Sequence, residues 1–435
     1  MLVDQYRTAV RQHLTEIGPS GTGPAGTPRQ GPRPLFLHLV VHLWMAMNAN
    51  IALPLLKKEL LPWNPVVAPA ARGLMDALSG VDPDAFARAV DAETRRRSDA
   101  FLTGLALYRH HPYQRRLADP PVIWQEGTTR LLDYSSQRGQ SGCPQGFPLL
   151  VVPSLVNRAY VLDLSERHSF MRTMAKWGFC PYLIDWQAPG DAERKFGWTE
   201  YIAGRLHRLL DVVVERVQRP VAVVGYCMGG LLALGLAVRR PEAVGSLTCL
   251  ATPWDFHAPR GSQMPFLQAL RPWLDAVIAV MGELPVDVLQ TLFFNLDPGL
   301  AERKFRVFAT LASTSAKAEE FVALEDWLND GIPLAGPVAQ DCLFGWYGEN
   351  SPLRRRWCVA GEPVLPESAT MPAMLVIPEQ DRIVPPPSAM ALADSIPGSA
   401  RIMVAAGHIS MMTSTKSTSL LYRPLAEWII KNTLK

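Results

Sequence analysis

One short segment constrains the fold of this chain more than any other. The sequence VAVVGYCMGG (221–230) is an apolar, β-branched run that ends at Cys227, and the helical pattern LLALGLAVRR follows it directly. Gly225 and Gly229 stand two residues before and two residues after Cys227. Small residues at these positions are typical of a sharp turn from a strand into a helix, where larger side chains would collide. Such a turn would present the Cys227 thiol at the end of a strand as a nucleophile.

The helix predicted after Cys227 adds electrostatic support to this interpretation. The first turn of a helix carries unpaired N–H groups and a partial positive charge, so it stabilises a negative charge that develops beside it. We expect the backbone N–H of Met228 to be the first donor to such an oxyanion. The second donor is expected in the loop after the apolar run LLVVP, where Ser154 and Leu155 are the alternatives and Leu155 is our candidate.

A nucleophile needs a base, and the base needs an acid that orients it. Two further apolar runs supply both groups: AMLVIPEQD ends on Asp381, and RIMVAAGH ends on His408. Asp255, in TPWDF, also follows an apolar run and competes with Asp381 for the role of the acid; we select Asp381. Nucleophile, acid and histidine in this chain order are the arrangement of the α/β-hydrolase fold.

The pattern of the rest of the chain agrees with that α/β fold. From about residue 121 to 435, short apolar runs alternate with stretches of helical length. This alternation predicts a mostly parallel central sheet with helices on both faces, and hence a catalytic domain over 121–435. Between about 255 and 370 the alternation stops and Leu-rich, aromatic helical stretches replace it. We interpret this segment as an inserted helical cap that acts as a lid.

The N-terminal part of the chain has a different character. Residues 1–34 include a stretch dense in Gly, Pro and Thr, which predicts a flexible tail. Residues 35–120 predict a helical region, which opens with the apolar run LFLHLVVHLWMAMNANIAL (35–53). Histidines and asparagines inside this run argue against a transmembrane span, although its length approaches that of one. We expect a buried or surface-seeking helix, with docking on a lipid or polymer surface as the alternative.

Composition narrows the classes of function. In 435 residues, 43 basic and 40 acidic side chains leave a formal charge of +3, so no nucleic-acid partner is expected. Hydrophobic residues make up 48% and charged residues 19%, which favours a globular protein that contacts something apolar. The six cysteines form no CxxC pair, so we expect reduced thiols, no metal and no bound cofactor. Without a secretory signal in the first residues, the cytoplasm is the expected location.

Several segments together resemble the polyhydroxyalkanoate synthase family, the cysteine-based acyltransferases that polymerise 3-hydroxyacyl-CoA. The similar stretches are GYCMGG around Cys227, DRIVPP around the acid, GHISMM around the histidine, LYRHHPYQR (107–115), VVPSLVNRAYVLDL (151–164) and YLIDWQAPG (182–190). The chain departs from the family in the cap, where FFNLDPGL (293–300) stands for the usual Phe-Trp-Asn-type segment.

The resemblance implies a role for each of the selected residues. Cys227 would take the acyl group as a thioester, His408 would remove the proton from the thiol or from the incoming hydroxyl, and Asp381 would orient His408. It also implies a hydroxyacyl-CoA substrate, a homodimer, and work at the surface of a polyester granule. Two other functions stay open. One is a cysteine-dependent esterase, thioesterase or depolymerase-like hydrolase, and the other is a non-catalytic granule-associated protein.

Overall fold

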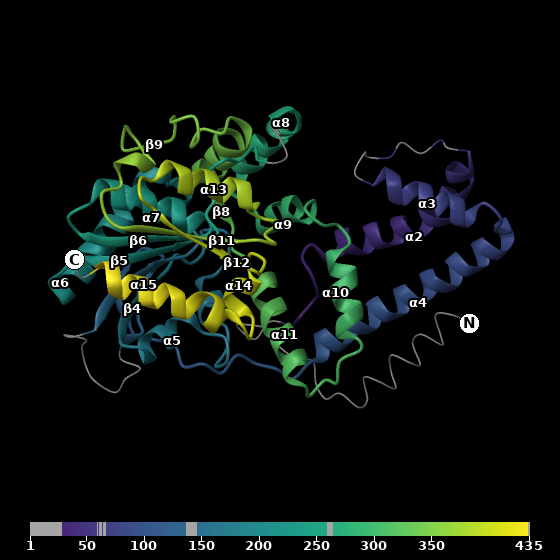
Figure 1. Ribbon diagram of the computed structural model, residues 1–435, viewed down its shortest axis with the longest axis horizontal. Helices are drawn as coiled ribbons and strands as arrows, with labels where there is room; N and C mark the ends of the chain where they lie inside the picture. Colours follow the sequence, from purple (N-terminus) through teal and green to yellow (C-terminus); the bar gives the residue numbers. More distant parts are fainter. Residues whose placement is uncertain are drawn as a thin grey trace. The chain divides into compact units, whose positions relative to one another are not determined.

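An eight-stranded sheet forms the centre of the larger of two units of the chain (Figure 1). The computed structural model describes residues 28–58, 60, 63, 67–135, 146–258 and 264–433, so most of the tail predicted over 1–34 lies outside the described residues. Unit 1 contains Met1–Gln114 and Gln290–Asn329, and unit 2 contains Arg115–Leu289 and Asp330–Lys435. Residues 290–329, inside the expected cap, are therefore part of unit 1.

The main sheet belongs to unit 2 and has the order β1-β2-β4-β3-β5-β6-β11-β12. Every neighbouring pair from β4 to β12 is parallel, whereas β2 pairs antiparallel with both β1 and β4. The mostly parallel sheet predicted from the sequence is confirmed. Its strands are β1 Val122–Glu126, β2 Thr129–Asp133, β3 Phe147–Val152, β4 Phe179–Asp185, β5 Val221–Tyr226, β6 Val244–Leu250, β11 Ala373–Pro378 and β12 Ala400–Val404.

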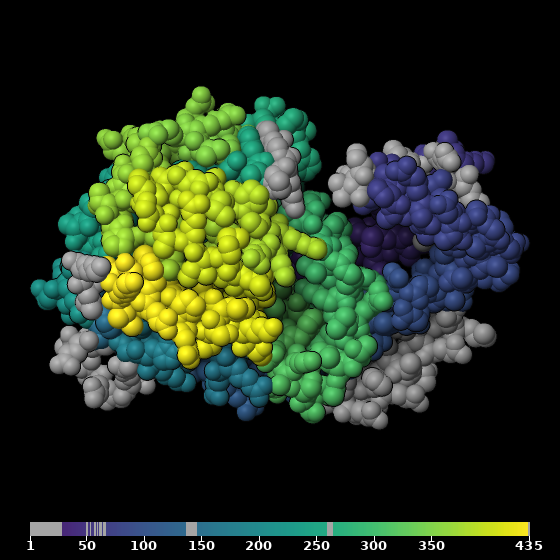
Figure 2. Space-filling model, in the orientation of Figure 1, coloured from purple at the N-terminus to yellow at the C-terminus, as the bar shows by residue number. Residues whose placement is uncertain are grey.

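Helices cover both faces of this sheet. In Figure 1, α7 (Met228–Arg239) and α13 (Pro386–Ser395) lie above the strands, and α5 (Phe170–Lys176) and α15 (Arg423–Thr433) lie below them. The residues of β4, β5 and β11 are all buried, which explains why these segments are continuously apolar rather than alternating. Figure 2 shows this covering from outside, where α13 and α15 hide the strands behind them.

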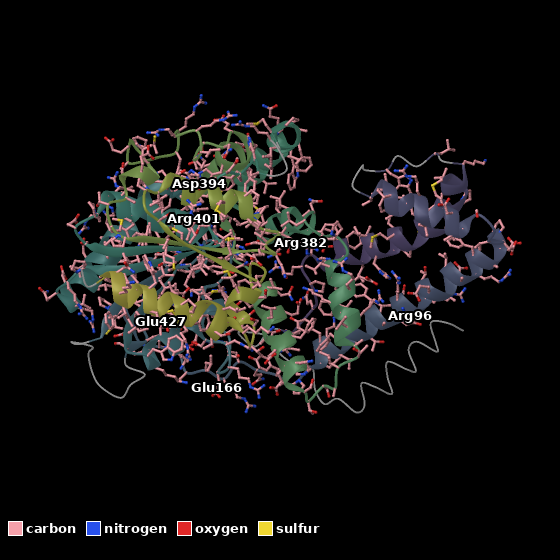
Figure 3. The ribbon with its side chains drawn as sticks, viewed as in Figure 1. Arg96, Glu166, Arg382, Asp394, Arg401 and Glu427 are labelled. Carbon is pink, nitrogen blue, oxygen red and sulfur yellow. The ribbon has the colours of Figure 1, made fainter. Side chains whose placement is uncertain are left out.

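The strand β12 forms one edge of the sheet. Its exposed Arg401 makes an ion pair with Asp394 of α13, with 2.8 Å between Nη1 and Oδ1, and Figure 3 labels both residues. A charged side chain on an edge strand discourages pairing with a foreign strand. Because β12 is an edge strand, the loop that follows it and contains His408 begins at the border of the sheet rather than at its centre.

Between β6 and β11 the chain leaves the main sheet and is mostly helical, where the sequence predicted an inserted cap; the action of this segment as a lid stays a prediction. In unit 2, tryptophans pack the insertion against the rest of the sheet domain. Trp346 of the insertion stacks on Trp198 with ring centroids 4.3 Å apart, and both side chains are buried. The elements of the insertion are α8 Met264–Met281, β7 Glu283–Leu284, α9 Val286–Phe294, α10 Leu300–Phe308, α11 Ala316–Asn329, β8 Leu334–Ala335, α12 Gly336–Gln340, η6 Asp341–Gly348, β9 Cys358–Val359, β10 Glu362–Pro363 and η7 Pro366–Ser368.

Unit 1 is helical and confirms the N-terminal helical region. It combines α2 (Leu35–Lys57), α3 (Ala68–Leu78) and α4 (Pro83–His110) with α10 and α11. Its core contains Phe101, Leu105 and Tyr108 of α4 together with Phe305, Phe308, Ala318 and Val322. Among the residues that the structure describes, no helix is both long enough and apolar enough to cross a membrane.

One expectation about the cysteines is wrong. Cys180, on β4, forms a disulfide, so not all six cysteines are reduced. The free thiols among the described residues are Cys227, Cys249, Cys342 and Cys358. Cys143 lies outside the described residues.

Candidate active site

Cys227 lies at the turn between β5 and α7. Its backbone has φ 57° and ψ −125°, a conformation that costs free energy in a residue with a side chain unless the surroundings enforce it. Two backbone hydrogen bonds do so: Cys227 N donates to Leu250 O at 2.8 Å, and Gly230 N donates to Cys227 O at 3.0 Å. The sharp strand-to-helix turn expected at this position is present.

The glycines around Cys227 are required by close backbone contacts. A Cβ atom added at Gly225 would lie 2.4 Å from the Cα of Gly230, and one added at Gly229 would lie 2.1 Å from the carbonyl oxygen of Val152. At Gly230 the added atom would lie 1.8 Å from Oγ1 of Thr252. No carbon atom fits at such distances, so the sequence pattern reflects packing of the turn against β3 and β6.

His408 and Asp381 meet in the loops that follow β12 and β11. The distance between His408 Nδ1 and Asp381 Oδ2 is 2.6 Å, and both side chains are buried. The other carboxylate oxygen of Asp381 accepts hydrogen bonds from the backbone N–H groups of Ile383 and Val384, each at 2.8 Å. The carboxylate is thereby fixed in orientation, and the Cys227 thiol is a further hydrogen-bond partner of the His408 imidazole.

Opposing influences set the pKa of His408. Burial lowers the pKa, because the charged imidazolium loses its hydration. The charges of Cys227 and Asp381 and the hydrogen bonds that both residues make to the imidazole act in the other direction and raise the pKa to about 10. His408 therefore holds a proton beside the Cys227 sulfur at neutral pH.

The competing acid, Asp255, has other partners. Its Oδ1 accepts hydrogen bonds from Asn350 Nδ2 at 2.7 Å and from the backbone N–H of His257 at 2.9 Å. These contacts anchor the segment after β6 to the segment after η6. The structure thus brings Asp381 to the histidine and gives Asp255 a role in fixing a loop.

The comparisons with known proteins fit this geometry. Residues 148–415 match the family model described as the alpha/beta hydrolase fold. Three curated relatives are poly(3-hydroxyalkanoate) polymerase subunits, from Haloferax mediterranei (29% identity, covering 71% of this chain and 63% of the relative), Synechocystis (30%, 66% and 78%) and Allochromatium vinosum (29%, 71% and 87%). This chain belongs to the poly(3-hydroxyalkanoate) polymerase family. It is an enzyme of the acyl-transferring type on an α/β-hydrolase fold, as the sequence predicted.

The expected oxyanion loop of this polymerase lies against the Cys227 turn. The contact at Gly229 already places the end of β3 and Pro153 beside α7, because an added Cβ would also lie 2.7 Å from Pro153 O. Trp186, after β4, donates its indole N–H to Pro153 O at 3.1 Å and holds the loop from the other side. Met228 is the first residue of α7, and Leu155 is buried. Their roles as oxyanion donors remain predictions.

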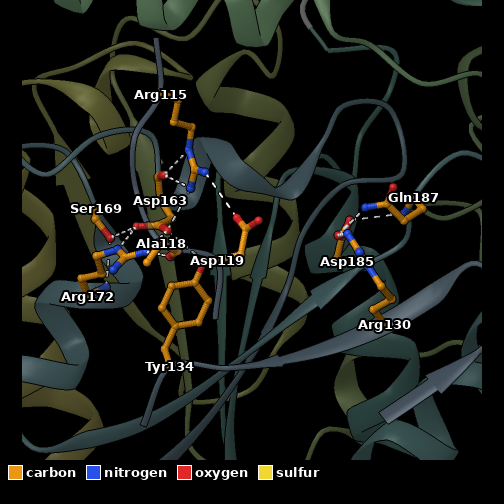
Figure 4. Close-up of polar contacts among 10 residues, drawn as sticks. All are labelled: Arg115, Ala118, Asp119, Arg130, Tyr134, Asp163, Ser169, Arg172, Asp185 and Gln187. Atoms are coloured by element: carbon orange, nitrogen blue, oxygen red, sulfur yellow. Dashed lines mark hydrogen bonds and ion pairs between the residues drawn. The ribbon is translucent and has the colours of Figure 1, made fainter. Parts of the chain in front are cut away.

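A buried charge cluster fixes the far end of the same loop, and sequence reasoning missed it (Figure 4). Asp163 is fully buried and accepts hydrogen bonds from Ser169 Oγ (2.6 Å), Arg172 Nε (2.8 Å), Arg115 Nη2 (3.1 Å) and Tyr134 OH (3.1 Å). A buried carboxylate needs this many donors to offset its lost hydration. Arg115 and Asp163 both lie in segments that resemble the family, but their pairing has no local signal.

A second polar group lies beside the first in Figure 4. Asp185, at the end of β4, forms an ion pair with Arg130 of β2 at 2.5 Å and also accepts a hydrogen bond from the side chain of Gln187. Asp185 is therefore a structural acid that joins neighbouring strands. Within the described parts of the chain, no group of three or more His, Cys, Asp or Glu side chains is arranged to hold a metal ion.

Proposed function

We propose that Cys227, His408 and Asp381 form the catalytic triad that transfers 3-hydroxyacyl groups from CoA thioesters to the hydroxyl end of a growing polyester. One observation carries the proposal: the imidazole of His408 contacts both other residues. It is a hydrogen-bond partner of the Cys227 sulfur in the strained turn, and its Nδ1 lies 2.6 Å from Oδ2 of the fixed Asp381 carboxylate. A nucleophile, a base and an orienting acid are the parts that covalent acyl transfer requires.

The reaction proceeds in two balanced steps. In the first, the Cys227 sulfur attacks the thioester carbonyl, the oxyanion receives the N–H groups of Met228 and Leu155, and the CoA sulfur leaves with the proton held on His408. In the second, His408 takes the proton of the acceptor hydroxyl while its oxygen attacks the acyl–Cys227 thioester. The new ester forms, and the Cys227 sulfur leaves. Asp381 keeps the imidazole oriented in both steps.

Sulfur suits this task better than oxygen. An acyl group on Cys227 is a thioester of nearly the same energy as the CoA thioester, so it stays activated for transfer to an alcohol. An acyl group on serine would be an ordinary ester, with little driving force for forming another ester. We propose that no further cofactor takes part, because acyl-CoA already supplies the activated group.

The test follows the release of CoA from 3-hydroxybutyryl-CoA by the wild type and by Cys227→Ala. We expect the substitution to remove turnover while the far-ultraviolet circular dichroism stays the same. Equal rates of CoA release in the two proteins would contradict the proposal.

Product analysis decides the acceptor. Oligomer and polymer formation supports transfer to a hydroxyl. Free 3-hydroxy acid without any oligomer, at every enzyme concentration, would instead support the thioesterase alternative, which the divergent segment 293–300 in the insertion keeps in play.

We further propose that α2 docks on the polyester product. The exposed side chains Phe36, Leu43, Trp44, Met47 and Ile51 recur at helical spacing along one face of α2, with Phe36 80% and Trp44 65% exposed. The helix contains no acidic residue, and its only lysine or arginine is the last residue, Lys57. An uncharged apolar stripe of this kind fits an apolar phase, and the proposed reaction produces one. Work at the granule surface and the homodimer implied by the resemblance belong to this proposal.

Binding to artificial polyester particles tests the docking surface. The double variant Leu43→Glu and Met47→Glu should reduce the bound fraction several-fold and leave CoA release from soluble substrate within about twofold. The matched control adds the same two negative charges on α4, as Ala89→Glu and Ala92→Glu, at exposed positions away from the stripe. Unchanged particle binding in the α2 variant, or equal losses in both variants, would refute docking through α2.

A further inference from the structure

Tyr226 touches the proposed base in two places. Its hydroxyl donates a hydrogen bond to the backbone carbonyl of His408 at 3.0 Å, and its ring lies against the imidazole with centroids 5.3 Å apart and planes inclined by 30°. The side chain is only 4% exposed. Tyr226 is also the last residue of β5, so it immediately precedes the nucleophile. One residue thus joins the Cys227 turn to the His408 loop.

The His408 loop needs such an anchor. Its own hydrogen bonds are local: Met411 N donates to Gly407 O, and Gly407 N donates to Ser410 Oγ. These bonds shape the loop but do not set its distance from β5. Among the described residues β12 pairs only with β11, so the sheet supports the loop from one side. Asp381 holds one ring nitrogen of His408, and Gln380 N donates to Ala406 O at 3.0 Å, but neither bond ties the loop to β5.

We propose that Tyr226 is a positioning residue that fixes the His408 backbone and ring relative to Cys227, independently of Asp381. The inference rests on the function proposed above. The strand β5 is hydrogen-bonded to β3 on one side and to β6 on the other, so its end is held from both sides. A base tied to that strand through Tyr226 keeps its distance to the nucleophile even though its own strand is at the edge. Displacements of about 1 Å in a catalytic group can cost on the order of a hundredfold in rate.

The chemistry of the hydroxyl suits this role. Burial, followed by the nearby charges of Cys227 and Asp381, raises the pKa of Tyr226 well above its usual value. The hydroxyl therefore stays a neutral donor around neutral pH. It can hold the carbonyl of His408 without exchanging protons with the triad.

Tyr422 provides a matched control. It is also a buried tyrosine, and its hydroxyl also donates to a backbone carbonyl, but that carbonyl belongs to Met412, and its ring packs against Phe170 rather than against His408. Tyr226→Phe and Tyr422→Phe each delete one buried hydroxyl and should lower the melting temperature by similar amounts. Only Tyr226→Phe should reduce kcat for CoA release, by about three- to tenfold, with KM changed by less than about twofold. Tyr226→Leu, which also removes the ring, should lose more.

The pH dependence of the rate distinguishes a positioning role of Tyr226 from a general loss of stability. The titratable groups around the site are His408 itself, Cys227, Asp381, Tyr226, Tyr422, which acts on Tyr226, and the buried Cys342 of η6, which is affected by the charge of Cys227. In Tyr226→Phe the imidazole is held less firmly beside Cys227 and Asp381, so the alkaline limb of the rate profile should move to lower pH. Tyr422→Phe should leave that limb in place. An unmoved limb in Tyr226→Phe, or equal losses of kcat in the two phenylalanine variants, would overturn the proposal.

A substrate-free measurement keeps this test separate from that of the proposed function. Iodoacetamide alkylates the Cys227 thiol without any acyl-CoA, and peptide mass spectrometry distinguishes Cys227 from the other cysteines. We expect slower alkylation of Cys227 in Tyr226→Phe than in Tyr422→Phe at neutral pH, because the imidazole no longer supports the sulfur as well. Failure of CoA turnover in the wild type would refute the proposed function, whereas equal alkylation rates in the two variants would refute the role of Tyr226 alone.

Discussion

The Cys227 turn and the His408 loop are held in different ways. Backbone atoms define the turn: glycines pack against carbonyl groups and Cα atoms, and a strained φ of 57° is locked by backbone hydrogen bonds. Side chains define the loop, through Asp381 at one ring nitrogen and Tyr226 at the backbone carbonyl. The first region leaves almost no freedom in sequence, while the second depends on residues that lie far away along the chain.

The largest effect on activity should come from the loop side of this comparison. Asp381→Asn replaces the charged carboxylate at His408 Nδ1 with a neutral amide and should reduce kcat by a factor on the order of 10² to 10⁴, as loss of the orienting carboxylate does in known triads. Asp255→Asn is the control, because it deletes a carboxylate at a neighbouring strand end without touching the histidine. Steady-state kinetics of CoA release measure both, and similar losses would show that Asp381 is not the acid.

Substitutions in the Cys227 turn should lower the free energy of unfolding as well as the rate of the reaction. Gly229→Ala forces a Cβ to within 2.1 Å of Val152 O, so the turn must move. We expect destabilisation by about 3 kcal/mol and loss of most activity. Gly73→Ala on α3 is the control: an added Cβ there meets nothing within 4 Å, and the change should stabilise by up to about 1 kcal/mol. Denaturant unfolding compares the two, and a stable Gly229→Ala would disprove the rigid turn.

The Asp163 cluster tests how much a buried ion-pair cluster between distant segments stabilises the protein. Asp163→Asn leaves Arg115 and Arg172 without their buried carboxylate and should destabilise the protein by about 3 kcal/mol. Asp119→Asn is matched, because Asp119 also pairs with Arg115, at 3.7 Å, but its side chain is 92% exposed. That variant should change the unfolding free energy by less than about 0.5 kcal/mol. Equal effects would mean that burial of Asp163 does not matter.

A further expected effect is a pH dependence of the free energy of unfolding that links both regions. The folded-state pKa of His408 is raised from 6.5 to about 10, so between these values the folded protein binds more protons than the unfolded chain. The stabilisation from His408 is complete below pH 6.5 and is lost as the pH rises through about 10. In Cys227→Ala burial is opposed by Asp381 alone, so the loss should begin at lower pH. Titration of the His408 ring by NMR checks this, and an unchanged midpoint would contradict it.

Much of the site could be predicted because it follows local rules. Adjacent residues in the sequence specify the Cys227 turn. Asp381 and His408 follow apolar runs in the chain order that the fold imposes. The parallel sheet follows from strands that are buried on both faces. These signals do not depend on knowing which segments pack together.

The parts that escaped prediction are contacts between distant segments. Arg115 and Asp163 are 48 residues apart, and Tyr226 and His408 are 182 apart, so no periodicity connects them. The division of the insertion escaped for the same reason: Gln290–Asn329 packs with α4 in unit 1, and the sequence shows only helices. The disulfide at Cys180 likewise depends on a fold that brings two thiols together.

The backbone definition of the Cys227 turn has a consequence for how such enzymes diverge. Glycine contacts, a positive φ and two main-chain hydrogen bonds shape this position, and none of them involves the sulfur atom. The backbone therefore determines the shape of this turn, and the side chain of the nucleophile does not contribute to it. Exchange of a single atom, sulfur for oxygen, leaves the turn intact and changes only the energy of the acyl intermediate. A polymer-forming transferase and an ester hydrolase can thus share the same turn and differ there by a single atom of the nucleophile.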